Sequence, residues 1–196
     1  MYWRWPCVQK GDLVHSALDD RELPMEGWPE IALMGRSNSG KSSLLNALLN
    51  RKTAHVSGKP GHTRRIHLYH VKQWYLVDLP GFGYAQGDLA DKERFSRAVD
   101  RYLTTRQALI GAVLIQDIRR DPGPEELMLR DWAATRNVLL VVAANKADKL
   151  SKTQVSERLQ SLADQYRIPV MPVSARTRAG VDAVKDALRG LGLEGL

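Results

Sequence analysis

Residues 31–50 are IALMGRSNSGKSSLLNALLN, and the order of residue types in this stretch decides the fold. The four apolar residues at 31–34 predict a strand, and the apolar spacing after residue 41 predicts a helix over 41–50. Between them, residues 35–42 have the pattern GxxxxGKS. In this pattern, backbone N–H groups surround phosphate oxygens at a helix N-terminus, where the helix dipole favours anions. The stretch therefore predicts a phosphate-binding loop.

Two residues of this loop have their own chemistry. Lys41 is long enough to bring its ammonium group to the β and γ phosphates of a nucleotide. Ser42 offers a hydroxyl to Mg²⁺, an ion that takes few protein ligands and prefers phosphate oxygens and water. The residues expected around the phosphates are Gly35, Arg36, Ser37, Asn38, Ser39, Gly40, Lys41 and Ser42.

Outside this stretch, short apolar runs alternate with longer amphipathic segments. We expect strands at 31–34, 66–71, 74–78, 110–116, 138–144 and 170–173, and helices at 41–50, 91–106, 124–135, 152–166 and 180–190. This alternation predicts an α/β fold in three layers, with a mostly parallel six-stranded sheet and helices on both faces. In residues 1–27 the apolar residues do not recur with a regular period, so we expect an N-terminal extension packed on a domain of residues 28–196.

A second candidate segment follows the predicted strand WYLVD. Asp78 ends that strand and is followed by Leu79, Pro80 and Gly81. A carboxylate at the carboxyl edge of the sheet lies beside the phosphate-binding loop and is suited to hold Mg²⁺ through water. Gly81 leaves room for its N–H to approach a γ-phosphate. By itself the segment is equally typical of a simple turn.

Asn145, Lys146, Ala147 and Asp148 form an NKxD pattern after the apolar run VLLVVAA. Guanine presents N1–H and a 2-amino group as paired donors, which one carboxylate accepts together, whereas adenine would leave Asp148 unpaired. Lys146 can lie along the ring, and Asn145 can join this loop to the phosphate-binding loop. Alone, NKxD is often a polar loop after a strand, and the combination with GxxxxGKS is what favours guanine binding.

Composition and charge exclude several classes of protein. The 196 residues are 43% hydrophobic and 26% charged, which excludes disordered and fibrous chains. The lone cysteine, Cys7, cannot form an internal disulfide, and no apolar run approaches the roughly 20 residues of a membrane span. We expect a cytoplasmic monomer with no membrane anchor and no DNA partner. The net charge of +7 favours a polyanionic partner.

A basic segment at 51–67 contains five Lys and Arg residues, three His residues and no acid. It is either a solvated loop or a surface that faces RNA, with Thr63 able to close on Mg²⁺ and γ-phosphate when GTP is bound. The loops that follow other strands carry four more arginines, which either extend this surface or are solvated. They are Arg119, Arg120, Arg176 and Arg178.

The motifs GRSNSGKSSLLNAL, PGHT, DLPGFGYA, DIR, NKADKL and VSA occur in this order. Together they resemble the EngB (YihA/YsxC) ribosome-biogenesis GTPases of the Era-like class, over about residues 27–190. The resemblance implies a Ras-like P-loop GTPase domain that binds GTP or GDP with Mg²⁺ and hydrolyses GTP slowly. It also implies action on rRNA of the large ribosomal subunit during assembly, and a link to cell division and septation.

Carried over by position, the resemblance assigns site residues beyond the phosphate-binding loop. Ser42 and Thr63 become Mg²⁺ ligands, and Lys41, Asn38 and Thr63 become catalytic residues. The segment 78–81 becomes the γ-phosphate sensor, and 145–148 recognises the base. The remaining nucleotide-binding residues are Gly61, His62, Thr63, Arg64, Arg65, Val173, Ser174 and Ala175.

The hydrolysis step lacks one expected group. Ras-like proteins place a water-orienting glutamine after DLPG, whereas this chain has Phe82. In related GTPases an asparagine at the position of Asn38 helps bind K⁺, which takes the place of an arginine finger; otherwise Asn38 only stabilises the loop. Two alternative functions remain: a GTPase that serves RNA modification, and an ATP-dependent small-molecule kinase, against which NKAD argues. A role in membrane traffic is disfavoured, because the sequence has no lipidation site.

Overall fold

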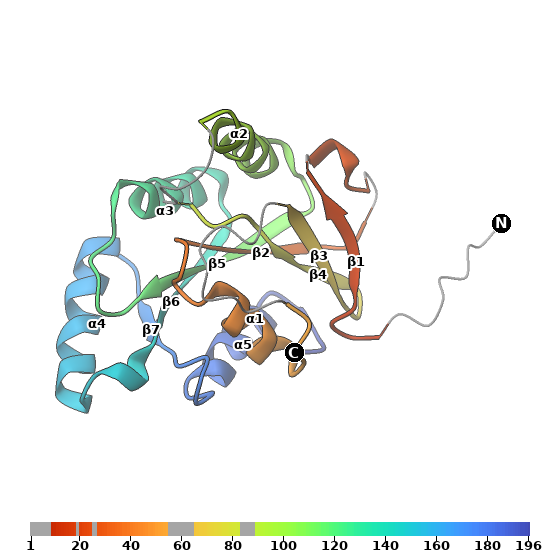
Figure 1. Cartoon of the computed structure of the whole chain (residues 1–196). Coiled ribbons are helices and arrows are strands. Elements are labelled where there is room, and N and C mark those ends of the chain that lie inside the picture. The colour runs from red at the N-terminus through yellow and green to blue at the C-terminus, as the bar shows by residue number, and fades with distance from the viewer. Residues whose placement is uncertain (1–8, 19, 25–26, 55–64, 83–88) are drawn as a thin grey trace.

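A seven-stranded sheet runs through the middle of the fold, in the order β1-β3-β4-β2-β5-β6-β7 (Figure 1). The structure is a computed structural model that describes residues 9–18, 20–24, 27–54, 65–82 and 89–196, the side chains of 20 and 89–96 excepted. The strands are β1 (Leu13–Ala17), β2 (Glu30–Gly35), β3 (Ile66–Val71), β4 (Trp74–Asp78), β5 (Leu109–Asp117), β6 (Leu139–Asn145) and β7 (Val170–Pro172). The helices are α1 (Lys41–Leu49), α2 (Leu89–Thr105), α3 (Pro124–Arg136), α4 (Lys152–Tyr166) and α5 (Val181–Arg189), with short 3₁₀ turns η1 (Asp20–Glu22) and η2 (Ala147–Lys149).

The direction of the strands determines where a site can form. Strands β4, β2, β5, β6 and β7 are parallel, and β3 is antiparallel to both β4 and β1. The carboxyl ends of the five parallel strands therefore lie along one edge of the sheet. Ligands of open α/β sheets bind outside this edge. The strand directions also confirm the predicted α/β architecture.

Within the described residues the sheet has seven strands, whereas the sequence analysis predicts six. The additional strand, β1, lies inside the segment interpreted as an irregular N-terminal extension, and it pairs with β3 at the edge of the sheet. The pairing register shifts between Leu13 and His15, which is typical of a β-bulge. A bulge breaks the alternation of inward and outward side chains, so LVHSA has no period of two for sequence reasoning to detect.

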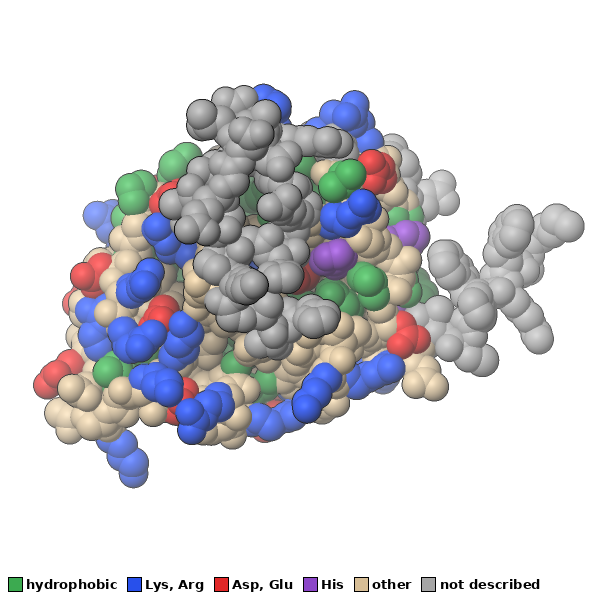
Figure 2. Space-filling model, in the orientation of Figure 1, with side chains coloured by type: hydrophobic (Ala, Val, Ile, Leu, Met, Phe, Trp, Pro, Cys, Tyr) green, Lys and Arg blue, Asp and Glu red, His purple; other side chains and the backbone are tan. Residues whose placement is uncertain are grey.

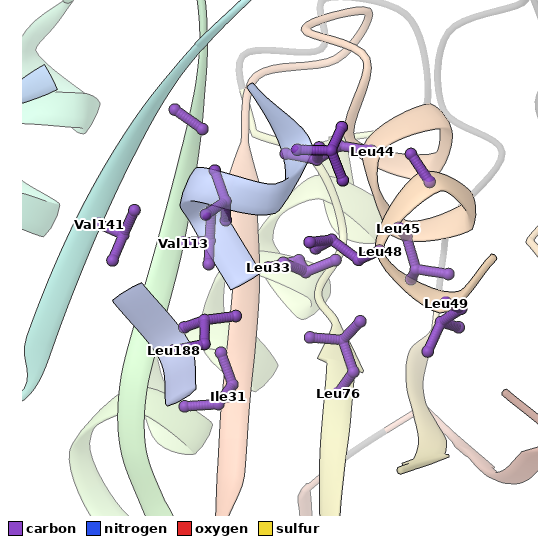
Figure 3. Packing of buried hydrophobic residues seen from close by; sticks show 14 of the residues in the cluster. Ile31, Leu33, Leu44, Leu45, Leu48, Leu49, Leu76, Val113, Val141 and Leu188 are labelled. Atoms are coloured by element: carbon purple, nitrogen blue, oxygen red, sulfur yellow. The ribbon is translucent and has the colours of Figure 1, made fainter. Parts of the chain in front are cut away.

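Two hydrophobic clusters hold the helices on the two faces of the sheet. Along β2, Ile31 and Leu33 belong to the first cluster, which includes α1 and α5, and Ala32 and Met34 belong to the second. Figure 3 shows side chains of α1 and Leu188 of α5 directed at the sheet in the first cluster. The second cluster includes side chains of α2, α3 and α4. Burial on both faces explains why β2 is a continuous apolar run.

The second cluster also contains a buried charge. Glu30 is fully buried and accepts hydrogen bonds from the Arg106 guanidinium, at 2.6 Å for Nη2, and from the Tyr102 hydroxyl at 2.8 Å. Burial, followed by the nearby Glu30 charge, raises the pKa of Tyr102 well above its usual value. The pairing satisfies a carboxylate that would otherwise be costly to bury.

We expect Leu48→Ala to lower the free energy of unfolding by about 2–5 kcal/mol, because truncating a buried leucine removes buried apolar surface and leaves a cavity. Leu48 is fully buried in the first cluster, between α1 and the sheet. Chemical denaturation measures the change. The control is Leu139→Ala: Leu139 is 41% exposed, so its loss should cost less than about 1 kcal/mol. Equal losses at the two positions would contradict this account of the core.

No helix in the described part of the chain is both long enough and apolar enough to cross a membrane.

Candidate nucleotide-binding site

The loop between β2 and α1 presents backbone N–H groups to a ligand. Gly40 is the N-cap of α1 in the left-handed conformation, with φ +96°, and no side chain caps this helix end. The first turn of α1 carries no acidic residue. A Cβ at position 40 would overlap Asn145 Nδ2, so the loop requires glycine here. The free N–H groups of α1 and its positive dipole end are suited to bind an anion.

Lys41 and Asp78 form a buried ion pair at the start of α1. Their side chains are 7% and 2% exposed, and Lys41 Nζ contacts Asp78 Oδ1. The Ser39 hydroxyl is buried nearby without a hydrogen-bond partner among the described residues. A buried ammonium group and an unsatisfied hydroxyl fit a phosphate, and the oxygens of Ser42 and Asp78 are of the kind that Mg²⁺ prefers. The residues present therefore fit a Mg²⁺-bound nucleotide.

The segment after β4 lies against the phosphate-binding loop. Ser37 N donates to the Phe82 carbonyl at 3.0 Å, and Leu79 N donates to the Leu33 carbonyl at 3.3 Å. A Cβ at Gly81 would lie 3.3 Å from the Gly35 carbonyl oxygen and from Ser37 N. The Phe82 ring packs against the second hydrophobic cluster. Residues 78–82 are thus beside the phosphate-binding loop, as the sequence predicts.

The side chain of Arg36 points away from this loop. Its Nη1 lies 3.4 Å from Glu125 Oε2 and 3.6 Å from Glu126 Oε2, at the N-terminus of α3. Glu126 is itself buried and accepts a hydrogen bond from Gly123 N at 3.0 Å. We therefore expect Arg36 to contribute its backbone to phosphate binding, with the side chain anchoring the loop to α3.

Asn145 joins three segments of the chain. Its Nδ2 donates to the Ser39 carbonyl at 2.9 Å, and its Oδ1 accepts from Ala175 N at 3.0 Å. The first of these bonds links the NKxD loop to the phosphate-binding loop as expected from the sequence. The second engages the backbone N–H of Ala175, one of the predicted nucleotide-binding residues, within the protein itself. Lys146 Nζ adds a bond of 2.6 Å to the Asn38 carbonyl.

Asp148 lies at the turn η2, with its side chain 14% exposed. Its Oδ1 accepts a hydrogen bond from the Ser174 hydroxyl at 2.8 Å, and its Oδ2 is 3.9 Å from Arg176 Nε. The Val173 backbone is bonded both to Ala144 and to Ala147, which fixes the loop after β7 against the NKxD loop. Asp148 therefore keeps acceptor capacity for two neighbouring donors of a base.

These segments enclose a cleft of about 770 Å³, within the usual volume range of ligand pockets. Its wall combines the phosphate-binding loop, α1, the segment 52–54, the NKxD loop and the loop after β7. The lining residues are Gly40, Ser43, Asn46, Lys52, Thr53, Ala54, Asn145, Lys146, Asp148, Lys149, Ala175 and Arg176.

Among the residues that sequence reasoning did not assign to the site, two have clear structural roles. Asn46 Oδ1 accepts from the N–H groups of Thr53 and Ala54, at 2.9 and 2.8 Å, and so shapes one wall of the cleft. Asp117 ends β5 at the same sheet edge and accepts a hydrogen bond from Lys146 at 2.9 Å. The signal that identified Asp78, an acid at the end of an apolar strand, was equally available for Asp117. Asn46 gave no signal, because an asparagine inside a helix is usually solvated.

Several predicted site residues cannot be placed. Gly61, His62, Thr63 and Arg64 lie outside the described residues, so their roles stay predictions. Arg65 is described and is exposed beside the start of β3.

A phosphate-binding loop at a helix N-terminus, an acid at the end of the neighbouring strand and an NKxD loop on the same cleft define a P-loop GTPase. A family model described as "50S ribosome-binding GTPase" matches residues 30–146. A probable GTP-binding protein EngB of Syntrophomonas wolfei is 40% identical over 188 residues, covering 94% of this chain and 97% of that protein. Its counterpart in Clostridioides difficile is 38% identical over 181 residues, covering 89% of each. The chain belongs to the EngB family, and the resemblance is confirmed.

Solved structures agree with this assignment. The crystal structure of a probable GTP-binding protein EngB has a TM-score of 0.69 and 25% identity, covering 83% of this chain and 97% of that one. An Era variant from Aquifex aeolicus bound to GDP and AlF₄⁻ has a TM-score of 0.71 and 23% identity, covering 85% of this chain and 57% of that one. The second likeness supports the fold alone.

Proposed function

We propose that the protein is a cytoplasmic GTP switch that hydrolyses GTP with Mg²⁺ and acts in assembly of the large ribosomal subunit, with a consequence for cell division and septation. The observation that carries this proposal is the joining of the phosphate-binding loop to the NKxD loop through Asn145. This bond fixes the distance between a base site and a phosphate site, which is what a nucleotide requires. Membership of the EngB family supports the proposal that the partner is the large ribosomal subunit.

In this proposal the buried ion pair rearranges when nucleotide binds. Lys41 leaves Asp78 for the β and γ phosphates, because a bound phosphate supplies the negative charge that Asp78 now provides. The Asp78 carboxylate would then be free to hold Mg²⁺ through water, and the hydroxyls of Ser42 and Thr63 would be its direct protein ligands. Mg²⁺ would neutralise charge on the β and γ phosphates. Lys41 and the N–H groups of the loop orient the phosphates, and Asp148 fixes the base.

The charge around the cleft suits an RNA partner. Lys52, Lys149 and Arg176 line the cleft and are exposed. Figure 2 shows Lys and Arg side chains along the left and lower margins of the face it draws, with Asp and Glu side chains among them on the left. Cations at such positions bind phosphates of RNA with strong dependence on salt.

Co-sedimentation with ribosomal subunits tests the partner. We expect the protein to sediment with immature large subunits in a GTP analogue more than in GDP, and less as salt rises. Neutralising Arg64 and Arg65 should flatten the dependence on salt. Equal sedimentation in GTP analogue and GDP, at low and high salt alike, would contradict ribosome binding. A GTPase serving RNA modification would then be the better candidate.

We expect GTP hydrolysis to be faster in K⁺ than in Na⁺ at constant ionic strength. Asn38 lies in the phosphate-binding loop with φ +66°, and its carbonyl accepts from Lys146. Phe82 cannot orient the attacking water, so a cation near the β and γ phosphates is the candidate for stabilising the transition state. Turnover assays in the two salts measure the difference.

The matched variant for this test is Asn38→Gly, since glycine keeps the positive φ without strain and removes only the side chain. We expect the K⁺ advantage to disappear in this variant while GDP affinity stays within about threefold, because the Asn38 carbonyl remains. Identical rates in K⁺ and Na⁺ for the unmodified protein would exclude the ion and leave the ribosome as the candidate accelerator.

A further inference from the structure

Asp117 occupies a junction between the base site and the surface. It ends β5, pairs in register with Asn145 of β6, and is 7% exposed. The neighbouring Ile118 N donates to the Asn145 carbonyl at 3.0 Å, which ties the end of β5 to the start of the NKxD loop. A carboxylate buried to this extent needs partners of opposite charge.

The carboxylate of Asp117 has two such partners. Its Oδ2 accepts from Lys146 Nζ at 2.9 Å and from Arg119 Nη2 at 2.7 Å. Its Oδ1 accepts from Arg119 Nε at 2.9 Å and from Arg119 N at 3.1 Å. Burial alone would raise the pKa of Asp117, but the hydrogen bonds from Arg119 and Lys146 hold it well below its usual range. The group is therefore a fixed negative charge at neutral pH.

Lys146 is held at both sides of its ammonium group, by Asp117 and by the Asn38 carbonyl. Its backbone is in the left-handed region, with φ +67°, and its side chain is 28% exposed beside the cleft. A free lysine side chain has many rotamers, and a ligand must otherwise restrict them when it binds. Fixing the ammonium group in advance leaves the aliphatic stem ready for the face of a base.

We propose that Asp117 is a positioning residue for the nucleotide base, acting through Lys146, and that Arg119 fixes Asp117 in the orientation this requires. The proposal rests on the proposed function, since it presupposes that the cleft binds a guanine nucleotide. Arg119 is 47% exposed, so the chain of contacts runs from the surface through Asp117 and Lys146 to the base.

Titration with GDP tests the role of Asp117. Removing a negative charge near an anion-binding cleft should by itself tighten binding, whereas loss of positioning should weaken it. We expect Asp117→Asn to raise the Kd for GDP about fivefold or more, the effect of weakening one hydrogen bond to a charged group. The matched control is Asp121→Asn, which removes the same charge from an exposed residue paired with Arg158. Its Kd should change less than about twofold.

A double-mutant cycle separates positioning from a general effect on the fold. In a Lys146→Ala background, Asp117→Asn should no longer raise the Kd beyond the change seen with Asp121→Asn. The ratio of GDP to inosine diphosphate affinity should stay unchanged in Asp117→Asn, because Lys146 contacts the ring face that both bases share.

Arg119→Ala provides a variant that leaves the buried residue in place. It should raise the Kd for GDP more than Arg120→Ala, which removes the same charge from the next residue, and the difference should vanish in the Lys146→Ala background. The inference is wrong if Asp117→Asn changes the Kd for GDP no more than Asp121→Asn does. It is also wrong if Asp117→Asn raises the Kd by the same factor in the Lys146→Ala background. In both cases the proposed function still stands. If the unmodified protein binds no GDP, the proposed function itself fails.

Discussion

Replacing Asp148 by Asn is expected to weaken GTP binding by about 10²–10⁴-fold, because two hydrogen bonds to a charged acceptor contribute roughly 1.5–3 kcal/mol each. Guanine offers donors at N1 and at the 2-amino group. The uncharged Asn amide has one oxygen for one of these donors, and its NH₂ group is placed against the other, so both charge-assisted bonds are lost. Xanthine has a carbonyl at C2 that pairs with the amide donor. We therefore expect xanthosine triphosphate to bind the variant better than GTP does.

The position of Asp148 makes this change specific. Its side chain is largely buried at the cleft, and a hydrogen bond from the Ser174 hydroxyl orients it. The side-chain oxygen of Asn would still accept this hydrogen bond. The loop should therefore keep its shape. Competition titrations with GTP, xanthosine triphosphate and ATP measure the preference. Asp182→Asn is the control, because the Asp182 side chain is 88% exposed on α5. If Asp148→Asn kept the normal preference for GTP, another residue would have to recognise the base.

Gly40→Ala is expected to lower GDP affinity at least tenfold. A left-handed residue other than glycine costs about 1–2 kcal/mol, and each 1.4 kcal/mol is a factor of ten. The added Cβ would also displace Asn145 Nδ2, which holds the phosphate-binding loop to the NKxD loop. One methyl group thus disturbs both the phosphate site and the base site.

Gly27→Ala is the matched control for this variant. A Cβ at Gly27 would meet only Tyr75 Cε2 at 3.6 Å, an ordinary contact. Its affinity for GDP should equal that of the unmodified protein, and thermal unfolding should show that both variants are folded. Normal GDP binding by Gly40→Ala would mean that the geometry of this loop is not required for nucleotide binding.

The sequence predicts most of the fold because the relevant signals are local. The β2 run follows from burial on both faces of the sheet, and the leucine spacing of α1 follows from packing of one side of that helix on the sheet. Strand β1 gave no such signal, because its bulge breaks the alternation and its pairing depends on β3, some fifty residues later. A partner distant in the chain cannot be read from five residues.

The same distinction applies to the site. GxxxxGKS and NKxD are local patterns, so their residues could be assigned in advance. The ion pair between Lys41 and Asp78, and the sharing of Asp117 by Lys146 and Arg119, depend on which strand ends are neighbours. Sheet order determines those neighbours, and the sequence specifies it only through the whole fold.

The most direct test of the guanine-nucleotide site is a calorimetric titration of the unmodified protein with GDP and with ADP, both with Mg²⁺. The orientation of Asp148 at the cleft predicts binding of GDP at one site and no measurable binding of ADP at the same concentrations. Equal affinity for the two nucleotides would contradict base recognition by Asp148, and would favour an ATP-dependent kinase instead.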